Sequence, residues 1–273
     1  MTPSIDLLGI EALSVFGLPP VEFVDVAADL GCRFITVFVQ NFAAVPLGYP
    51  PFSLQDDSRL RADVLAAMDH RGVGISLGDG FLVLPGADMR SFGRDLDLMV
   101  ELRVPRINVV SLDPDLERTV DQIGALAELA AQRQIETVIE PVPGLTIGDL
   151  PTALTVLQHI SRPDVRLLID TMHLVRSGSG AADLCTVAPE QIGYAQLCDT
   201  TLAPQAGNYA EEAMFERMVP GEGELPLSEI LAALPDDIVI GLEVPQRSLA
   251  LSGVGPAARL RPCVEAAQGL LRR

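Results

Sequence analysis

The sequence contains no lysine and no tryptophan, and all 19 of its basic side chains are arginines. Without a lysine amine, the chain cannot be a Schiff-base aldolase, a pyridoxal-phosphate enzyme or a phosphate-binding-loop NTPase. Basic residues are also few beside the 37 acidic ones, which gives the 273-residue chain a formal net charge of −18. Because a surface that binds nucleic-acid phosphates or anionic lipid must be basic, we expect neither a nucleic-acid partner nor a membrane partner.

Long apolar runs and paired cysteines are missing as well. No stretch approaches the ~18 consecutive apolar residues that cross a bilayer, and the first six residues lack the basic start of a signal peptide. The four cysteines are scattered without a Cys-x-x-Cys pair, so we interpret them as small hydrophobic residues in a reducing compartment. These features together predict a cytoplasmic protein.

Eight short apolar runs, rich in β-branched residues, recur along the chain. Each is short enough for a strand that is buried on both faces, as in parallel sheets. The runs span residues 5–10, 34–39, 73–77, 106–110, 137–139, 165–169, 192–197 and 238–242. Helical patterns fill the intervals at 19–30, 57–70, 89–102, 115–132, from 149 onward, 227–234 and 257–271. The interval after the sixth run is the least regular, because Ser177-Gly178-Ser179-Gly180 interrupts it.

The alternation of eight strands with helices predicts an α/β fold, a single (β/α)8 TIM barrel over residues 1–273. An open doubly wound sheet is the alternative, and such a sheet normally carries a glycine-rich phosphate-binding turn after its first strand. Here the first strand is followed by Glu11-Ala12-Leu13-Ser14. This turn favours the closed barrel.

Polar residues close four consecutive predicted strands, the fifth to the eighth. In a barrel the carboxyl ends of the strands line the mouth of the active site, so these side chains should meet there. Carboxylates brought together without a cation repel one another, whereas a divalent metal makes such a cluster favourable. An all-oxygen set suits Mg²⁺ or Mn²⁺ better than zinc. The predicted ligands are Glu140, Asp170, Gln196 and Glu243. The alternative is that each acid caps a helix or lies in a solvated loop.

Further polar residues are expected near this mouth. His173 is the one histidine placed at the catalytic face, where it would contact a ligand, bind substrate or donate a proton. The connection from residue 199 to 226 is long for a compact domain, which is typical of a functional loop. It carries Asp199, Tyr209 and Arg217, which we predict to bind substrate, Arg217 through an oxygen or a carboxylate.

The first four predicted strands offer substrate contacts that the sequence does not rank. These are Glu11, Gln40, Asp79 and Asn108. Three phenylalanines near the same strand ends would either line an apolar wall of the site or pack in the core. These are Phe38, Phe42 and Phe81.

With these residues in view, the chain resembles the xylose isomerase-like TIM barrel superfamily of sugar phosphate isomerases and epimerases. The resemblance covers nearly the whole chain and is strongest from Glu140 onward. It rests on the order and spacing of several short pieces. They are Ile139-Glu140-Pro141, Asp170-Thr171-Met172-His173, Gln196-Leu197-Cys198-Asp199, Arg217-Met218-Val219-Pro220-Gly221-Glu222-Gly223 and Leu242-Glu243.

The resemblance implies roles for individual residues. Keto-sugar 3-epimerases of this group bind one Mn²⁺, Mg²⁺ or Co²⁺ through Glu, Asp, His and Glu, and the two glutamates exchange the substrate proton. These positions correspond to Glu140, Asp170, Gln196 and Glu243, while His173 and Arg217 would contact substrate. Gln196 stands where the family commonly has histidine, and bacterial 3-dehydroshikimate dehydratases resemble this changed set. Relatives that cleave DNA use a histidine-rich zinc cluster, which one usable histidine and the acidic charge exclude.

The resemblance therefore implies a metal-dependent isomerase or epimerase of a keto-sugar or related polyhydroxy ketone. Glu140 or Glu243 would remove a proton beside the carbonyl, and the ion would hold the enediolate. If a β-hydroxyl leaves with the help of His173, the enzyme is instead a dehydratase of the 3-dehydroshikimate or keto-inositol type. A non-catalytic sugar-binding barrel is the alternative from another class. Superfamily members are often dimers or tetramers, so the resemblance also allows a homo-oligomer.

Overall fold

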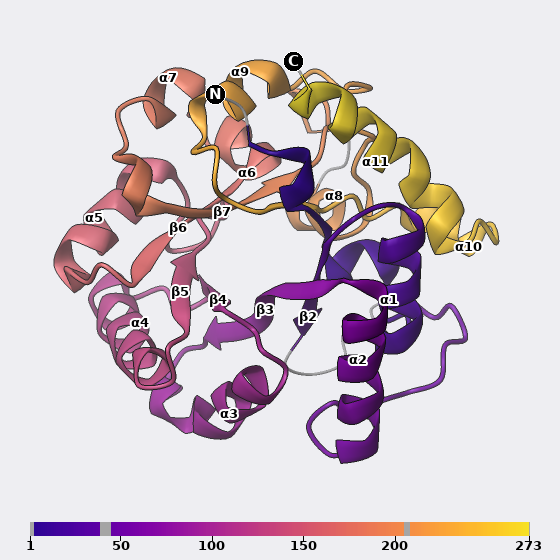
Figure 1. The fold of residues 1–273 in the computed structure, drawn as a ribbon. Coiled ribbons are helices and arrows are strands. Elements are labelled where there is room, and N and C mark those ends of the chain that lie inside the picture. The colour runs from indigo at the N-terminus through magenta and orange to yellow at the C-terminus, as the bar shows by residue number, and fades with distance from the viewer. Residues whose placement is uncertain (1–2, 39–44, 205–207, 273) are drawn as a thin grey trace.

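The structure is a computed structural model that describes residues 3–38, 45–204 and 208–272. Eight parallel strands pair in chain order, and β1 pairs with β8 to close a barrel (Figure 1). The strands are β1 (Leu8–Ile10), β2 (Phe34–Phe38), β3 (Gly74–Val83), β4 (Arg106–Ser111), β5 (Glu136–Ile139), β6 (Val165–Asp170), β7 (Ile192–Leu197) and β8 (Ile240–Leu242). The (β/α)8 barrel predicted from the sequence is confirmed.

Helices surround the barrel on its outside (Figure 1). The α-helices are α1 (Pro20–Asp29), α2 (Ser58–Arg71), α3 (Gly93–Glu101), α4 (Leu116–Ala131), α5 (Leu150–Ile160), α6 (Thr171–Arg176), α7 (Ala181–Leu184), α8 (Tyr209–Phe215), α9 (Leu227–Ala233), α10 (Arg247–Leu251) and α11 (Pro256–Leu271). Short 3₁₀ helices are η1 (Ile5–Leu7), η2 (Ala12–Val15), η3 (Met89–Phe92) and η4 (Pro189–Gln191). Within the described ranges, none of these helices has the length and apolar character that crossing a membrane requires.

Three long helices begin next to the aspartates at which the sequence predicted their starts. The carboxylates of Asp57, Asp115 and Asp149 each accept a hydrogen bond from the backbone N–H three residues further on. A helix leaves its first N–H groups without partners inside the helix, and a capping aspartate satisfies one of them. These caps place the starts of α2, α4 and α5.

Several elements differ from the prediction, and β8, for example, begins at Ile240 and not at residue 238. Residues 5–7 form η1, capped by the Ser4 side chain, so that β1 is shorter than the predicted strand. The strand predicted at 73–77 runs on to Val83, because the chain continues through an irregular register with β4 between Gly78 and Phe81. Asp79 consequently lies within β3 instead of beyond its end. The interval after β6 splits into α6 and α7, and Gly178 in the left-handed region separates them.

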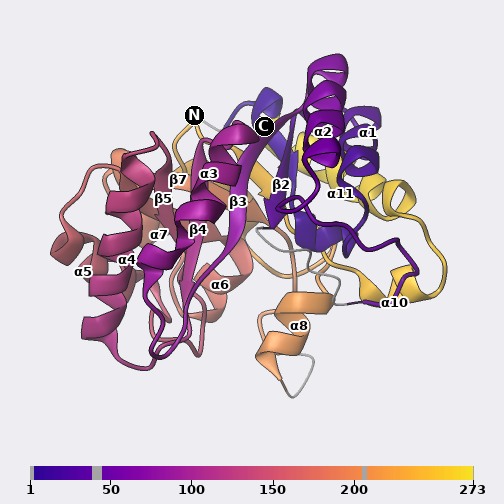
Figure 2. The same cartoon turned by 90° about the horizontal axis from the view of Figure 1, so that it is seen from below.

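The register of the sheet brings the ends of the later strands to one level. Asp170 pairs with Gln196 across β6 and β7, and Gln196 pairs with Gly241 across β7 and β8. Glu140 and Glu243 directly follow β5 and β8. All of these residues therefore lie at one end of the barrel, the end from which α8 projects (Figure 2).

The inside of the barrel is closed by side chains from strands on different sides of it. Leu77, Val138, Leu168, Tyr194 and Val239 form a buried cluster that is separate from the large core between strands and helices. Side chains from β3, β5, β6 and β7 can meet in this way only inside the barrel, since successive residues of a strand face opposite sides. This cluster is the floor on which the polar strand-end residues lie.

Candidate active site

The four predicted metal ligands are buried together at the carboxyl end of the barrel. Asp170 and Gln196 are the most deeply buried, with exposed fractions of 2% and 1%, and Glu140 and Glu243 are each 8% exposed. Asp170 and Gln196 lie within the last two residues of β6 and β7, and Glu140 and Glu243 come directly after β5 and β8. Charged groups are rarely buried unless they are paired, so the partners of these carboxylates are informative.

Glu140 lies beside His173 and Asn108. One oxygen, Oε1, lies 3.4 Å from His173 Nε2, and the other, Oε2, accepts a hydrogen bond of 2.5 Å from Asn108 Nδ2. Asp170 Oδ1 accepts from the His173 backbone N–H at 2.8 Å and so caps α6. Among the histidine, cysteine and acidic side chains of the described residues, Glu140, Asp170 and His173 bring their ligand atoms within 4.8 Å of one another.

Arg217 joins Asp170 to Glu243. Its guanidinium lies 2.5 Å from Asp170 Oδ2 and 2.9 Å from Glu243 Oε2, and it is buried. Burial by itself raises the pKa of Asp170, but Arg217 and His173 outweigh this effect, so the pKa lies below its usual value. The pKa of Glu243 is raised well above its usual value. Burial and the negative charges of Glu140 and Asp170 raise this pKa by more than the positive charge of Arg217 lowers it.

Gln196 has one end of its amide paired and the other end free. Nε2 lies 3.3 Å from Glu243 Oε1 and 3.4 Å from Glu11 Oε2. Oε1 is buried and has no hydrogen-bond partner among the described residues. A buried carbonyl oxygen without a donor is costly, and a cation beside it would remove that cost. Together with the neighbouring carboxylates, this oxygen makes an arrangement that fits a divalent cation.

Tyr209 and Asp199, both predicted to bind substrate, have different surroundings. The Tyr209 hydroxyl lies 2.5 Å from His173 Nδ1, so α8 brings it against the site. The Asp199 carboxylate accepts four backbone N–H groups at 2.8–3.1 Å, those of Thr200, Gly221, Gly223 and Leu225. Asp199 therefore anchors the loop that follows Arg217, and its contact with substrate stays a prediction.

The first half of the barrel contributes two further buried acidic side chains, Glu11 and Asp79. The sequence had offered both as substrate contacts without ranking them. Glu11 is 1% exposed and accepts a hydrogen bond of 2.8 Å from the Tyr194 hydroxyl. Burial, together with Asp79 nearby, raises its pKa to about 8. Burial and the charge of Glu140 raise the pKa of Asp79 to about 7. Tyr194 was not among the predicted site residues, although a tyrosine within an apolar strand indicates a buried hydroxyl that needs a partner.

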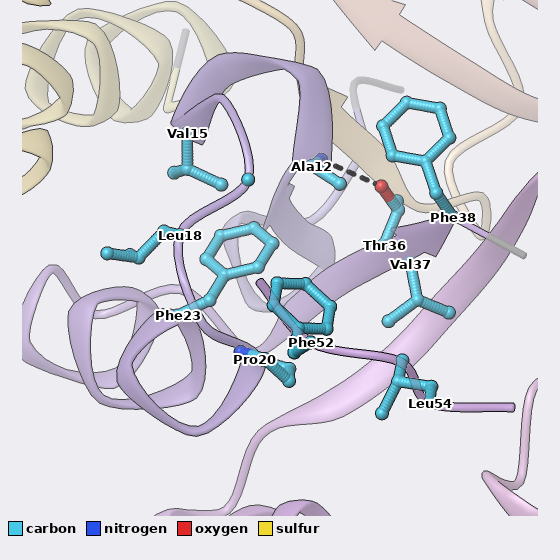
Figure 3. Close-up of a pocket in the computed structure, with 11 residues that line it drawn as sticks. Ala12, Val15, Leu18, Pro20, Phe23, Thr36, Val37, Phe38, Phe52 and Leu54 are labelled. Atoms are coloured by element: carbon cyan, nitrogen blue, oxygen red, sulfur yellow. Dashed lines mark hydrogen bonds between the residues drawn. The ribbon is translucent and has the colours of Figure 1, made fainter. Parts of the chain in front are cut away.

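The predicted phenylalanines divide between core and pocket. Phe81 is fully buried in the core, whereas Phe38 lines a small apolar cavity of about 30 Å³ beside β2 and α1 (Figure 3). The Thr36 hydroxyl in this lining accepts a hydrogen bond from the Ala12 N–H at 2.9 Å. Such a cavity is too small for a sugar. Gln40 and Phe42 lie outside the described residues.

Comparisons with known proteins agree with this architecture. A family model described as xylose isomerase-like TIM barrel matches residues 24–268. No protein with a curated description matches the chain by sequence. Solved structures with the same fold include an IOLI protein with a bound zinc atom, at 15% identity and a TM-score of 0.78, where the match covers 99% of this chain and 98% of that one.

Two further structures of this fold are enzymes by their descriptions. One is the probable 3-DHS dehydratase AsbF of Bacillus anthracis, at 16% identity and a TM-score of 0.72, with 97% of this chain and 98% of that one covered. The other is D-allulose 3-epimerase of Methylomonas sp. in complex with D-allulose, at 17% identity and a TM-score of 0.71, with 100% and 98% covered. At such identities the likeness shows the fold alone, and the function has to be argued from the site.

Proposed function

Because the chain belongs to the xylose isomerase-like TIM barrel family, we propose that it is a divalent-metal-dependent isomerase or epimerase of keto-sugars or related polyhydroxy ketones. The observation that carries the proposal is the buried Gln196 Oε1, which lacks a hydrogen-bond partner among the described residues. It belongs to a side chain whose Nε2 lies 3.3 Å from the carboxylate of Glu243. The epimerase of the same fold that was solved with D-allulose supports the substrate class.

The residues that would hold the ion are Glu140, Asp170, Gln196 and Glu243. When bound there, a divalent cation would polarise the substrate carbonyl and make the neighbouring C–H more acidic. The all-oxygen donor set favours Mn²⁺ or Mg²⁺, with Co²⁺ as a further option. His173 lies close enough to Glu140 and Asp170 to serve as a further ligand or to orient them.

The proton transfer falls to the two glutamates. Glu140 Oε1 would take or return a proton on one side, because Asn108 holds Oε2 of the same carboxylate. Glu243 Oε1, which faces Gln196, would do so on the other side. Arg217 would bind a substrate oxygen, and Tyr209 would orient His173 through Nδ1. A glutamate that returns the proton to the opposite face of the carbon gives an epimer.

A dehydratase is the second candidate, and two features favour it. Gln196 replaces the histidine that sugar epimerases of the family commonly carry, and His173 Nε2 lies 3.4 Å from Glu140 Oε1. After Glu140 removes the proton, His173 could protonate a departing β-hydroxyl. The probable 3-DHS dehydratase of the same fold supports this candidate.

Solvent isotope exchange tests both candidates. The protein with Mn²⁺ is incubated in D₂O with ketoses that include D-allulose, and separately with 3-dehydroshikimate. Deuterium incorporation without loss of water indicates an isomerase or epimerase, whereas a growing enone absorbance indicates a dehydratase. Glu140→Gln and Glu243→Gln should each lower the rate about a hundredfold or more.

The matched control is Glu229→Gln, which changes an exposed glutamate of α9 and should leave the rate unchanged. A protein that exchanges no deuterium with any ketose and forms no enone would contradict the proposed enzyme. Sugar binding that survives Glu140→Gln and Glu243→Gln in such a protein would instead support the non-catalytic barrel.

A further inference from the structure

Gln196 can serve as an oxygen ligand only if its amide is turned the right way. The side chain has a donor end, Nε2, and an acceptor end, Oε1, and the two have nearly the same shape. With Oε1 toward the proposed ion the amide attracts a cation, and with Nε2 in that place it repels one. A histidine at this position would raise a different question, namely which ring nitrogen carries the proton. A metal site that uses Gln196 therefore needs a neighbouring group that fixes the orientation of this amide.

Two carboxylates lie near the donor end. Glu243 Oε1 is 3.3 Å from Nε2, and Glu11 Oε2 is 3.4 Å from it. Glu243 is itself a proposed ligand of the ion, so its oxygens would bind the ion once it is present. Glu11, which follows β1 at the start of the chain, then remains as the acceptor for Gln196 Nε2. If the amide turned over, Gln196 Oε1 would lie against Glu11 Oε2, which is unfavourable for two acceptors whenever Glu11 Oε2 carries no proton.

Glu11 is held firmly in the place from which it reaches Gln196. It follows β1, and its backbone N–H donates to Leu242 O at 3.0 Å, so it continues the pairing of β1 with β8. Its other oxygen, Oε1, accepts from the Tyr194 hydroxyl at 2.8 Å, and that hydroxyl lies 3.0 Å from Ser76 Oγ. The carboxylate is 1% exposed, so neither oxygen turns freely toward water.

Gly241 allows Glu11 to cross the strand that separates it from Gln196. β8 lies between β1 and β7, and Gly241 of β8 pairs with Gln196 on one side. A Cβ at this glycine would collide with Glu11 Oε1 and would lie 2.8 Å from the Tyr194 hydroxyl. The lack of a side chain at this point leaves room for the carboxylate beside the strand.

We propose that Glu11 is a positioning residue that orients the Gln196 amide, so that Oε1 is presented to the divalent cation. The inference rests on the proposed function, since it assumes an ion held by Gln196. It goes beyond that function because Glu11 is not among the predicted ligands and would act through Gln196. Groups of this kind, which orient a ligand without binding the metal, commonly change metal affinity about 10- to 100-fold when they are lost.

The test measures Co²⁺ binding to the chelator-treated full chain, by calorimetry and by the visible absorption of the ion. Glu11→Met keeps the length of the side chain but removes the acceptor, and it should weaken Co²⁺ binding about 10- to 100-fold. Its absorption spectrum should change in the same way as that of Gln196→Ala. Glu11→Gln should bind Co²⁺ nearly as well as wild type, because its amide oxygen can still accept from Gln196 while its NH₂ donates to Tyr194.

A double-mutant comparison separates positioning from general support of the fold. In the Gln196→Ala background, adding Glu11→Met should weaken Co²⁺ binding no more than about twofold, since no amide remains to be oriented. If Glu11→Met does not fold, Glu11→Asp replaces it, because the shorter side chain withdraws the acceptor and should also weaken binding.

The outcomes distinguish the inference from the function on which it rests. Wild-type affinity in Glu11→Met or Glu11→Asp would overturn the inference and leave the metal site standing. An equal loss with and without Gln196 would also overturn it, because Glu11 would then act as a ligand or as part of the fold. A wild-type chain that binds no Co²⁺ would overturn the proposed function, and the inference with it.

Discussion

Arg217 places a positive charge inside the proposed metal site. Three carboxylates, Glu140, Asp170 and Glu243, surround the proposed ion, and Arg217 supplies a single positive charge to two of them. If all of these groups are ionised, two negative charges remain, which one divalent cation balances. The same guanidinium lies between two of the four proposed ligands. We therefore expect its interactions with Asp170 and Glu243 to weaken when an ion binds.

Replacing Arg217 should destabilise the metal-free protein. Arg217→Met leaves Asp170 and Glu243 buried without their cationic partner, and losses of this kind cost about 3 kcal/mol or more. Urea unfolding in the presence of a chelator measures the change, and adding Mn²⁺ should restore part of the lost stability. The control Arg90→Met changes an arginine whose side chain is 65% exposed and should have little effect. Equal stability of wild type and Arg217→Met in chelator would contradict this account.

Among the elements, the connection between β7 and β8 carries Tyr209 and Arg217, two of the proposed substrate-binding residues. α8 brings Tyr209 to His173, and a buried ion pair of 2.7 Å between Arg176 and Glu212 fastens this helix to the barrel. Further along, Asp199 holds the loop that follows Arg217. The position of Arg217 thus depends on anchors at both ends of its segment.

Asp199 gives this element its own test. Asp199→Asn replaces one acceptor oxygen by an NH₂ group that faces backbone N–H donors, and an unsatisfied buried group costs about 1–3 kcal/mol. Hydrogen exchange at the amides of Gly221, Gly223 and Leu225 should become faster, while exchange in the strands changes little. Asp236→Asn, at an exposed position, serves as the control. Unchanged exchange at these amides would show that Asp199 does not hold the loop.

The bounds of the strands could be predicted from the sequence in part. Strands β4 to β7 were predicted to within one residue at each end, because their apolar runs are bounded by prolines, charges or helix caps. β3 was predicted too short, since Gly78-Asp79-Gly80 looks like a turn, although the chain stays extended through it. Residues that close parallel strands necessarily share one end of a barrel, which is why the four proposed ligands could be grouped. The contact of Glu11 with Gln196 depends on strand closure and on Gly241, and no local pattern reveals it.

At the scale of the whole molecule, buried carboxyl groups inside the barrel should make stability depend on pH. Burial raises the pKa of Asp79 from 3.8 to about 7, so the folded protein holds a proton there that the unfolded chain releases more easily. The stability that this group contributes is complete below pH 3.8. It is lost as the pH rises through about 7.

Asp79→Asn removes this dependence. In chelator, the variant should gain stability relative to wild type as the pH rises from 4 to 7, and the difference should be constant above pH 8. Thermal or urea unfolding over this pH range measures it, with Asp237→Asn at an exposed position as the control. A difference that shrinks as the pH rises would mean that Asp79 is ionised in the folded protein at low pH.

The most direct test of the central claim is to locate the ion itself. A crystal of the wild-type chain grown with Mn²⁺, measured at the manganese absorption edge, shows where the metal lies. The account predicts one anomalous peak per chain among the oxygens of Glu140, Asp170, Gln196 and Glu243, with Arg217 no longer bridging two of them. No peak at saturating Mn²⁺, or a peak away from these four side chains, would contradict it.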